Sequence, residues 1–131
     1  MGTSMRMRIL AALLLAAPWL VQAAGLGELH VSSKLGQPLR GEIPVVSVKP
    51  GEALLSANIA SLDAYAKAGL TLRPGVAGAR VSIETMKGKP VIRIKGRQSV
   101  NEPAVDLLVE LRSSTGQVVR AYRVLLDRPK I

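Results

Sequence analysis

The sequence predicts an antiparallel β-sandwich of the immunoglobulin-like type with one short helix. About seven short segments alternate between apolar and polar residues, and turn residues such as Gly, Pro, Asn and Ser bound them. The apolar residues are mainly aliphatic, with no Phe, one Trp and two Tyr, and β-branched aliphatics favour strands over helices. Closely spaced strands are typical of a sandwich. A partly open β-barrel is the alternative, because the sequence does not fix how the sheet closes.

Three strands are expected in the first half of the chain. Residues 28–32 alternate, and residues 39–48 follow a turn that contains Gly and Pro. Pro44 indicates that the second strand lies at an edge or contains a bulge, because proline cannot donate to a strand ladder. Residues 49–52 (Lys-Pro-Gly-Glu) predict a type II turn. Residues 55–59 form the third strand, with Leu55, Ala57 and Ile59 alternating along it.

One helix is expected at residues 61–69. Ser61 is a suitable N-cap, and Gly69 fits the position just after the helix. Two turns of helix are not stable alone, so this segment must pack on a sheet. The three-to-four spacing predicts an inward face made of Leu62, Tyr65 and Ala66. Residues 70–78, with Pro and two Gly, are expected to form a loop.

Two hairpins are expected in the second half. The first joins residues 81–86 to residues 91–95 through Lys87-Gly88-Lys89, and the second joins residues 105–112 to residues 118–126. The alternation predicts which side chains of these strands face inward. They are Val81, Ile83, Thr85, Ile92, Ile94, Val105, Leu107, Val109 and Leu111.

Residues 1–23 have the pattern of a secretory signal peptide. Arg6 and Arg8 precede an apolar segment, and Val-Gln-Ala at residues 21–23 suits cleavage after Ala23, within one residue. The apolar segment is short and Pro18 interrupts it, whereas a membrane span needs about 20 apolar residues. An uncleaved N-terminal anchor is the alternative. We therefore expect one secreted domain at residues 25–131.

The positive charge of the chain is concentrated on the first predicted hairpin. The formal net charge is +9, and it becomes +7 when Arg6 and Arg8 are removed with the leader. Such an excess attracts anionic partners. The candidate docking surface consists of Arg80, Lys87, Lys89, Arg93, Lys95 and Arg97. The alternative is a solvated face that protects an edge hairpin from aggregation.

The sequence gives no indication of an enzyme. The chain has no Cys and a single His, His30, so neither a disulfide nor a Cys-based metal site is available, and no cofactor is expected. No phosphate-binding loop, dinucleotide-binding motif or nucleophile elbow is present. A triad of Ser32, His30 and Asp63 could arise by chance among so many serines. Nucleic acid is not an expected partner, because aromatic side chains that would stack on bases are missing.

Several segments, in this order, resemble the N-terminal periplasmic domain of the FimV family. The resemblance covers nearly the whole chain after the leader. Its blocks are residues 24–31, 33–39, 49–52, 61–69, 102–103, 106–111, 116 and 122–127.

The resemblance implies a non-enzymatic module in the periplasm that supports an envelope machine such as the type IV pilus. In this family the domain normally precedes a peptidoglycan-binding LysM module, a membrane span and an acidic cytoplasmic region. The printed sequence ends at Ile131, so we expect either a free-standing relative or a fragment of a longer product. The implied partners are envelope proteins such as the pilus secretin or alignment complex. An anionic cell wall or membrane surface is a further candidate at the basic hairpin. A chaperone- or adhesin-like sandwich that captures strands of partner subunits is the alternative function.

Overall fold

The computed structural model describes residues 24–129, so the predicted leader at residues 1–23 and the final residues 130–131 lie outside the described residues. The described part contains eight strands and two short helices. They are β1 (Gly25–Leu26), β2 (His30–Val31), β3 (Pro38–Val46), β4 (Leu54–Ile59), α2 (Leu62–Lys67), α3 (Pro74–Ala77), β5 (Arg80–Met86), β6 (Lys89–Ser99), β7 (Ala104–Ser113) and β8 (Gly116–Leu125).

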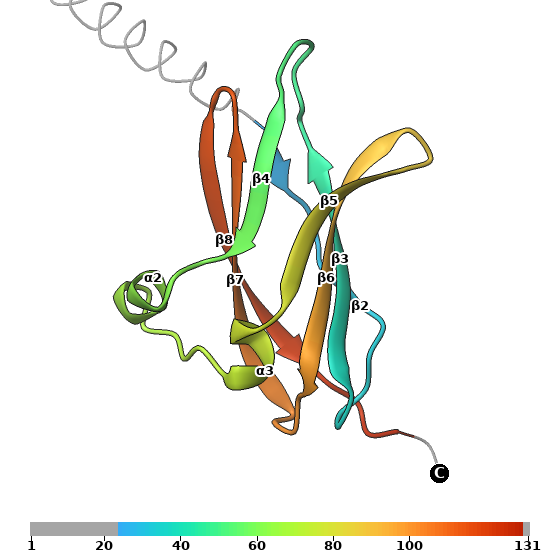
Figure 1. The fold of residues 1–131 in the computed structure, drawn as a ribbon, viewed down its shortest axis with the longest axis vertical. Helices are drawn as coiled ribbons and strands as arrows, with labels where there is room; N and C mark the ends of the chain where they lie inside the picture. The colour runs from blue at the N-terminus through green and yellow to red at the C-terminus, as the bar shows by residue number, and fades with distance from the viewer. Residues whose placement is uncertain (1–23, 130–131) are drawn as a thin grey trace, which may run out of the picture.

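The strands form two antiparallel sheets that face each other (Figure 1). One sheet has the order β1-β3-β6-β5, with β2 also paired to β3, and the other has the order β4-β7-β8. Among the described residues, no strand pairing joins the two sheets into one. The predicted sandwich is therefore confirmed, and the alternative of a partly open barrel is not. The five-stranded sheet carries the basic hairpin formed by β5 and β6.

The core lies between the two sheets and is almost entirely aliphatic. Its members include the predicted inward residues Ile92, Ile94, Leu107 and Val109, which have no exposed surface. Val81 and Ile83 pack at its border, whereas Thr85 is exposed. The alternation of these two hairpins was therefore predicted correctly except at the end of β5.

Pro44 does not lie in an edge strand, whereas the alternative prediction, a strand that contains a bulge, agrees with the register shift of β3 between Pro38 and Arg40. Pro44 lies within β3, which has β6 on one side and β1 and β2 on the other. Its carbonyl oxygen accepts a hydrogen bond from the nitrogen of Gly27 at 2.8 Å. The nitrogen and carbonyl of one residue face the same side of a strand, so the missing N–H also faces this side. The interruption between β1 and β2 therefore accommodates a proline inside the sheet.

Leu55 marks a bulge in β4. Leu54 pairs with Ser113 and Ser56 pairs with Arg112, so β4 has one more residue than β7 over this step. The extra residue shifts the alternation, and Leu54 packs against the core while Leu55 is exposed. The predicted alternation through Leu55 was therefore wrong at this one position.

The predicted helix is present as α2, and Ser61 caps its N-terminus as predicted. The Ser61 hydroxyl accepts a hydrogen bond from the nitrogen of Ala64 at 3.1 Å. Of the predicted inward face, only Tyr65 is buried. Leu62 is 69% exposed, and Ala66 is also exposed. A helix of six residues has room to bury little more than one large side chain, so the three-residue face was too wide.

Tyr65 anchors α2 to the outer face of the three-stranded sheet, where it packs on Leu108 and Ala60. Its hydroxyl accepts a hydrogen bond from the nitrogen of Leu108 at 2.8 Å and donates one to the carbonyl of Asp106 at 3.2 Å. The neighbouring strand β4 ends at residue 59. The Tyr65 hydroxyl thus satisfies backbone groups of β7 that β4 no longer reaches.

The predicted loop at residues 70–78 contains the short helix α3. Pro74 begins this helix, at a position where proline is favoured because its N–H is not needed. Val76 is fully buried, and Gly75 lies against Val100. α3 therefore covers the lower end of the sandwich in Figure 1.

Candidate functional site

A row of three positive side chains crosses the outer face of the five-stranded sheet. On β3, Arg40 pairs directly with Lys95 of β6, and Lys95 pairs directly with Arg80 of β5. All three side chains are exposed, and none has a carboxylate within 4.0 Å among residues 24–129. Side chains opposite each other on antiparallel strands are close neighbours, and like charges in this arrangement repel. The row is therefore not explained by a contribution to the stability of the fold.

Arg93 lies on the same face, two residues along β6, and its charge is already balanced. Its Nη2 lies 3.2 Å from Oε1 of Glu42, and its Nε lies 3.2 Å from Oε1 of Glu84. Only 28% of the Arg93 side chain is exposed. The two carboxylates come from the strands on either side of β6, so Arg93 links β3, β6 and β5. It is therefore a structural residue of the face rather than a free cation.

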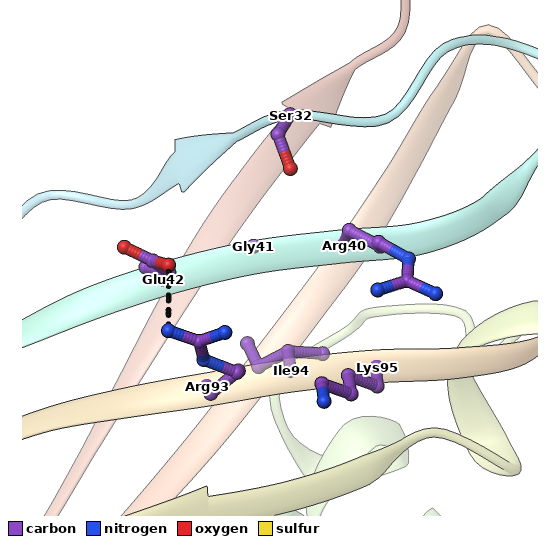
Figure 2. Close-up of a pocket in the computed structure, with 7 residues that line it drawn as sticks. All are labelled: Ser32, Arg40, Gly41, Glu42, Arg93, Ile94 and Lys95. Carbon is purple, nitrogen blue, oxygen red and sulfur yellow. Dashed lines mark ion pairs between the residues drawn. The ribbon is translucent and has the colours of Figure 1, made fainter. Parts of the chain in front are cut away.

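A shallow hollow lies between the basic row and Arg93. Its volume is about 110 Å³. Figure 2 shows Ser32 directed toward β3 from the neighbouring segment, with Arg40 and Lys95 on adjacent strands and Glu42 paired to Arg93. The hollow is lined by Ser32, Arg40, Gly41, Glu42, Arg93, Ile94 and Lys95. A carboxylate that entered it could accept bonds from the serine hydroxyl and from the two free cations.

The six predicted docking residues do not form one surface. Arg80 and Lys95 belong to the basic row, and Arg93 is held by carboxylates. Lys87 and Lys89 lie at the tip of the β5–β6 hairpin, which projects beyond the sheet in Figure 1. Lys89 at the tip lies about 20 Å from Lys95 along β6, because each residue of a strand adds about 3.3 Å. The sixth residue, Arg97, lies in the stretch of β6 where its register with β3 shifts.

Arg40 and Glu42 alternate with the apolar side of their strand in the sequence, but they were not among the predicted docking residues. Their alternation was visible, whereas the pairing of β3 with β6 joins segments about 50 residues apart in the chain and has no local signal. Ser32 was also missed as a lining residue, because it follows the very short strand β2.

Neither a metal-ligand cluster nor the serine triad considered from the sequence is present among the described residues. Within residues 24–129, no three His, Asp or Glu side chains are grouped as metal ligands. Asp63 lies on α2, outside the three-stranded sheet, and pairs with Lys67, whereas His30 lies on β2 of the other sheet. The chance triad that includes these two residues is therefore not assembled. No helix in this described range has the length and apolar character to span a membrane.

A second polar cluster ties two turns together at the opposite end of the sandwich from α3. The predicted turn at residues 49–52 is present, with Gly51 at a φ of 81° and the nitrogen of Glu52 bonded to the carbonyl of Lys49 at 2.9 Å. The Glu52 carboxylate accepts hydrogen bonds from the hydroxyl of Ser113, at 2.7 Å, and from the hydroxyl of Thr115. It also accepts one from the nitrogen of Lys49 at 3.0 Å. These bonds hold the β3–β4 and β7–β8 turns side by side.

The Glu52 cluster predicts a specific acid dependence of stability. Hydrogen bonds from Thr115, Lys49 and Ser113 lower the pKa of Glu52 from 4.5 to about 2. The folded-state pKa is below the unfolded one, so the ionised carboxylate stabilises the fold above about pH 5, and this contribution is lost as the pH falls toward 2. We expect Glu52→Gln to lower the melting temperature at pH 7 and to differ less from the unmodified protein at pH 2.

The control for this prediction is Glu28→Gln, which removes the same charge from an exposed position. Melting temperatures of the three proteins are compared by circular dichroism between pH 2 and pH 7. A constant difference between Glu52→Gln and the unmodified protein over this range would contradict the assigned carboxylate contacts.

The two facing antiparallel sheets, with a charged outer face and an aliphatic core, define an immunoglobulin-like sandwich domain. The family model described as the FimV N-terminal domain, an Ig-like domain, matches residues 24–129. The chain therefore belongs to the family of FimV N-terminal domains, as its sequence blocks predicted.

Two relatives show the same similarity. The chain is 32% identical over 124 residues to the motility hub protein FimV of Pseudomonas aeruginosa PAO1, and 32% identical over 124 residues to that of strain UCBPP-PA14. The matched region is 93% of this chain but only 14% and 13% of the two relatives. The chain thus spans about one seventh of the length of these curated relatives. No solved structure gives a significant match to it.

Proposed function

We propose that the chain is a non-enzymatic periplasmic module that binds an acidic segment of an envelope protein and supports a motility machine such as the type IV pilus. Membership of the FimV N-terminal family supports a role in motility, because the relatives carry the name motility hub protein. The leader pattern at residues 1–23 supports export from the cytoplasm. The pilus secretin or alignment complex is the proposed partner assembly.

The basic row Arg40–Lys95–Arg80 is the observation that carries the proposal. Its three cations lie on three neighbouring strands of one sheet, so they form a fixed surface rather than a flexible tail. The adjacent cation, Arg93, is compensated by Glu42 and Glu84. Of these four cations, Arg93 is paired with carboxylates and the other three lie together without an ion pair among the described residues, an arrangement that an acidic peptide segment would complement.

A sandwich that captures strands of partner subunits is the second candidate function, and the position of β5 supports it. β5 ends the strand order of the five-stranded sheet, so its outer edge could accept an added strand of a partner subunit. This mode depends on backbone hydrogen bonds. It should therefore tolerate charge reversal on the neighbouring face.

The test compares two triple variants with the same change in charge. Arg40→Glu, Arg80→Glu and Lys95→Glu reverse the row, whereas Lys87→Glu, Lys89→Glu and Arg97→Glu reverse the other exposed cations of the predicted surface. The full chain, tagged at its C-terminus, is cross-linked in cells that make type IV pili. We expect the row variant to recover on the order of tenfold less secretin or alignment-complex protein, with a smaller effect of the second triple variant.

Each competing mode of binding gives a different result in the same experiment. Equal losses in both triple variants would indicate attraction by total charge to an anionic surface and would contradict a defined docking row. Full recovery in both variants would place binding at a strand edge. Recovery of no envelope protein by the unmodified chain, together with normal twitching of a deletion strain, would contradict the proposed function itself.

A further inference from the structure

The backbone nitrogen of Ala24 lies in the Glu52 cluster. It is 3.3 Å from Oε2 of Glu52, the oxygen that also accepts the hydroxyl bonds of Ser113 and Thr115. Ala24 is buried and belongs to the core. The chain thus enters the sandwich with one backbone donor directed at a carboxylate that two turns hold in place.

The Glu52 carboxylate has the features of a built site for a cation. It is fixed by donors from residues 49, 113 and 115, which lie on two turns far apart in the sequence. All of these partners are neutral, so the negative charge is positioned and hydrogen bonded but not paired with a positive group. Among the described residues, no Lys or Arg forms an ion pair with Glu52.

We propose that Glu52, Ser113 and Thr115 form a binding site for the α-ammonium group that is created when the Ala23–Ala24 peptide bond is cleaved. A leader peptidase would hydrolyse this bond with water. The oxygen of water goes to the carbonyl carbon of Ala23, which leaves as a carboxylate, and the nitrogen of Ala24 becomes an ammonium. The product is a mature chain whose first residue is bound at its nitrogen by Glu52. This inference is independent of the basic row.

Charge makes the ammonium a better occupant than the backbone amide. An amide supplies one neutral donor, whereas an ammonium supplies three donors and a full positive charge, and charge-assisted hydrogen bonds are about twice as strong as neutral ones. The sequence alone left the cleavage position uncertain by one residue. Cleavage after Ala24 would start the chain at Gly25, which pairs with Val46 in the sheet, and would leave Glu52 without this donor.

The charged groups on the surrounding elements do not compete for Glu52. On β8, Arg120 donates to the backbone carbonyls of residues 26 and 27 at 2.8 and 3.0 Å. On β7, Arg112 pairs with a carboxylate of its own strand. On the β3–β4 turn, Lys49 contributes its backbone nitrogen, and its residue is exposed. Within residues 24–129, Glu52 is the acidic residue whose carboxylate accepts a hydrogen bond from the backbone nitrogen of Ala24.

The first test is the N-terminus of the protein recovered from cells that export the full chain. Intact mass and N-terminal sequencing should both give Ala24 as the first residue. A start at Gly25 or at another residue would overturn the proposal, and so would a retained leader.

The second test is the titration of the α-amino group in the exported protein. Selective ¹⁵N labelling of alanine allows the Ala24 resonance to be followed by NMR between pH 6 and pH 11. The neighbouring carboxylate should raise the pKa of this group above the value of about 8 that is usual for a terminal amine. Stability from the ion pair would then be present below pH 8 and would be lost as the pH rises through the raised pKa.

Glu52→Gln should return this pKa to about the usual value of 8, whereas the control Glu28→Gln should leave it raised. If Glu52→Gln does not fold, the titration of the unmodified protein still decides the question, because an unperturbed pKa there would overturn the ion pair. Enzymatic N-acetylation gives an independent readout, since it should remove the alkaline loss of melting temperature.

Discussion

Replacing Tyr65 with alanine should lower the free energy of unfolding by about 3–5 kcal/mol, the range found when a buried aromatic is truncated. The side chain has no exposed surface and is the main contact between α2 and the three-stranded sheet. Its loss removes the packing of α2 and also leaves the backbone of β7 without two hydrogen bonds. Urea denaturation followed by circular dichroism measures the change. Since small domains are stable by only about 5–15 kcal/mol, the variant should be close to unfolding at 37 °C.

Tyr65→Phe separates the two causes. It keeps the ring and removes only the hydroxyl, which leaves the buried N–H of Leu108 unsatisfied and should cost about 1–3 kcal/mol. The amide of Leu108 should then exchange its hydrogen faster than in the unmodified protein. A Phe variant with unchanged stability and unchanged exchange would show that the hydroxyl does not act as the partner of β7.

Leu107→Ala should lower the free energy of unfolding by about 2–5 kcal/mol. Leu107 is fully buried on the inner face of β7, the central strand of its sheet. Truncation there leaves a cavity between two sheets, and β7, which is hydrogen bonded on both sides, has little freedom to move into it. The measurement is again the urea midpoint, at an unchanged dependence of the free energy on urea concentration.

Leu125→Ala is the matched control for this cavity. It makes the same chemical change on the partner strand β8, at a side chain that is 72% exposed. A surface change of this kind should alter the free energy of unfolding by no more than about 0.5 kcal/mol. Similar effects of the two leucine variants would contradict the assignment of the core to the space between the sheets.

The sequence was sufficient to predict what depends on neighbours along the chain. The alternation of β6 and β7, the cap at Ser61 and the turn at residues 49–52 are local, and all three are present. The predictions for Leu55 and Leu62 were wrong because tertiary structure overrode the periodic pattern. Leu55 lies at a bulge, where its strand has an extra residue, and Leu62 lies on a helix too short to bury it.

The candidate site was predicted only in part, since it depends on register across strands. The hairpin of β5 and β6 places Arg80 beside Lys95 through a short connection, and the sequence indicated both residues. Arg40 joins them by the pairing of β3 with β6, which no local pattern specifies. The same pairing brings Glu42 to Arg93 and removes that residue from the free cations. The total positive charge was thus visible in the sequence, and its distribution between bound and free cations was not.

The hydroxyl of Tyr65 has a consequence for how the molecule behaves among copies of itself. Where β4 stops, β7 would otherwise present bare backbone donors and acceptors, and an exposed edge of this kind can recruit a strand from another chain. One phenol group and the helix behind it close this segment without adding a strand. Protection against self-association at this edge therefore resides in a single side chain, so substitutions at residue 65 should promote aggregation even in conditions where most molecules remain folded.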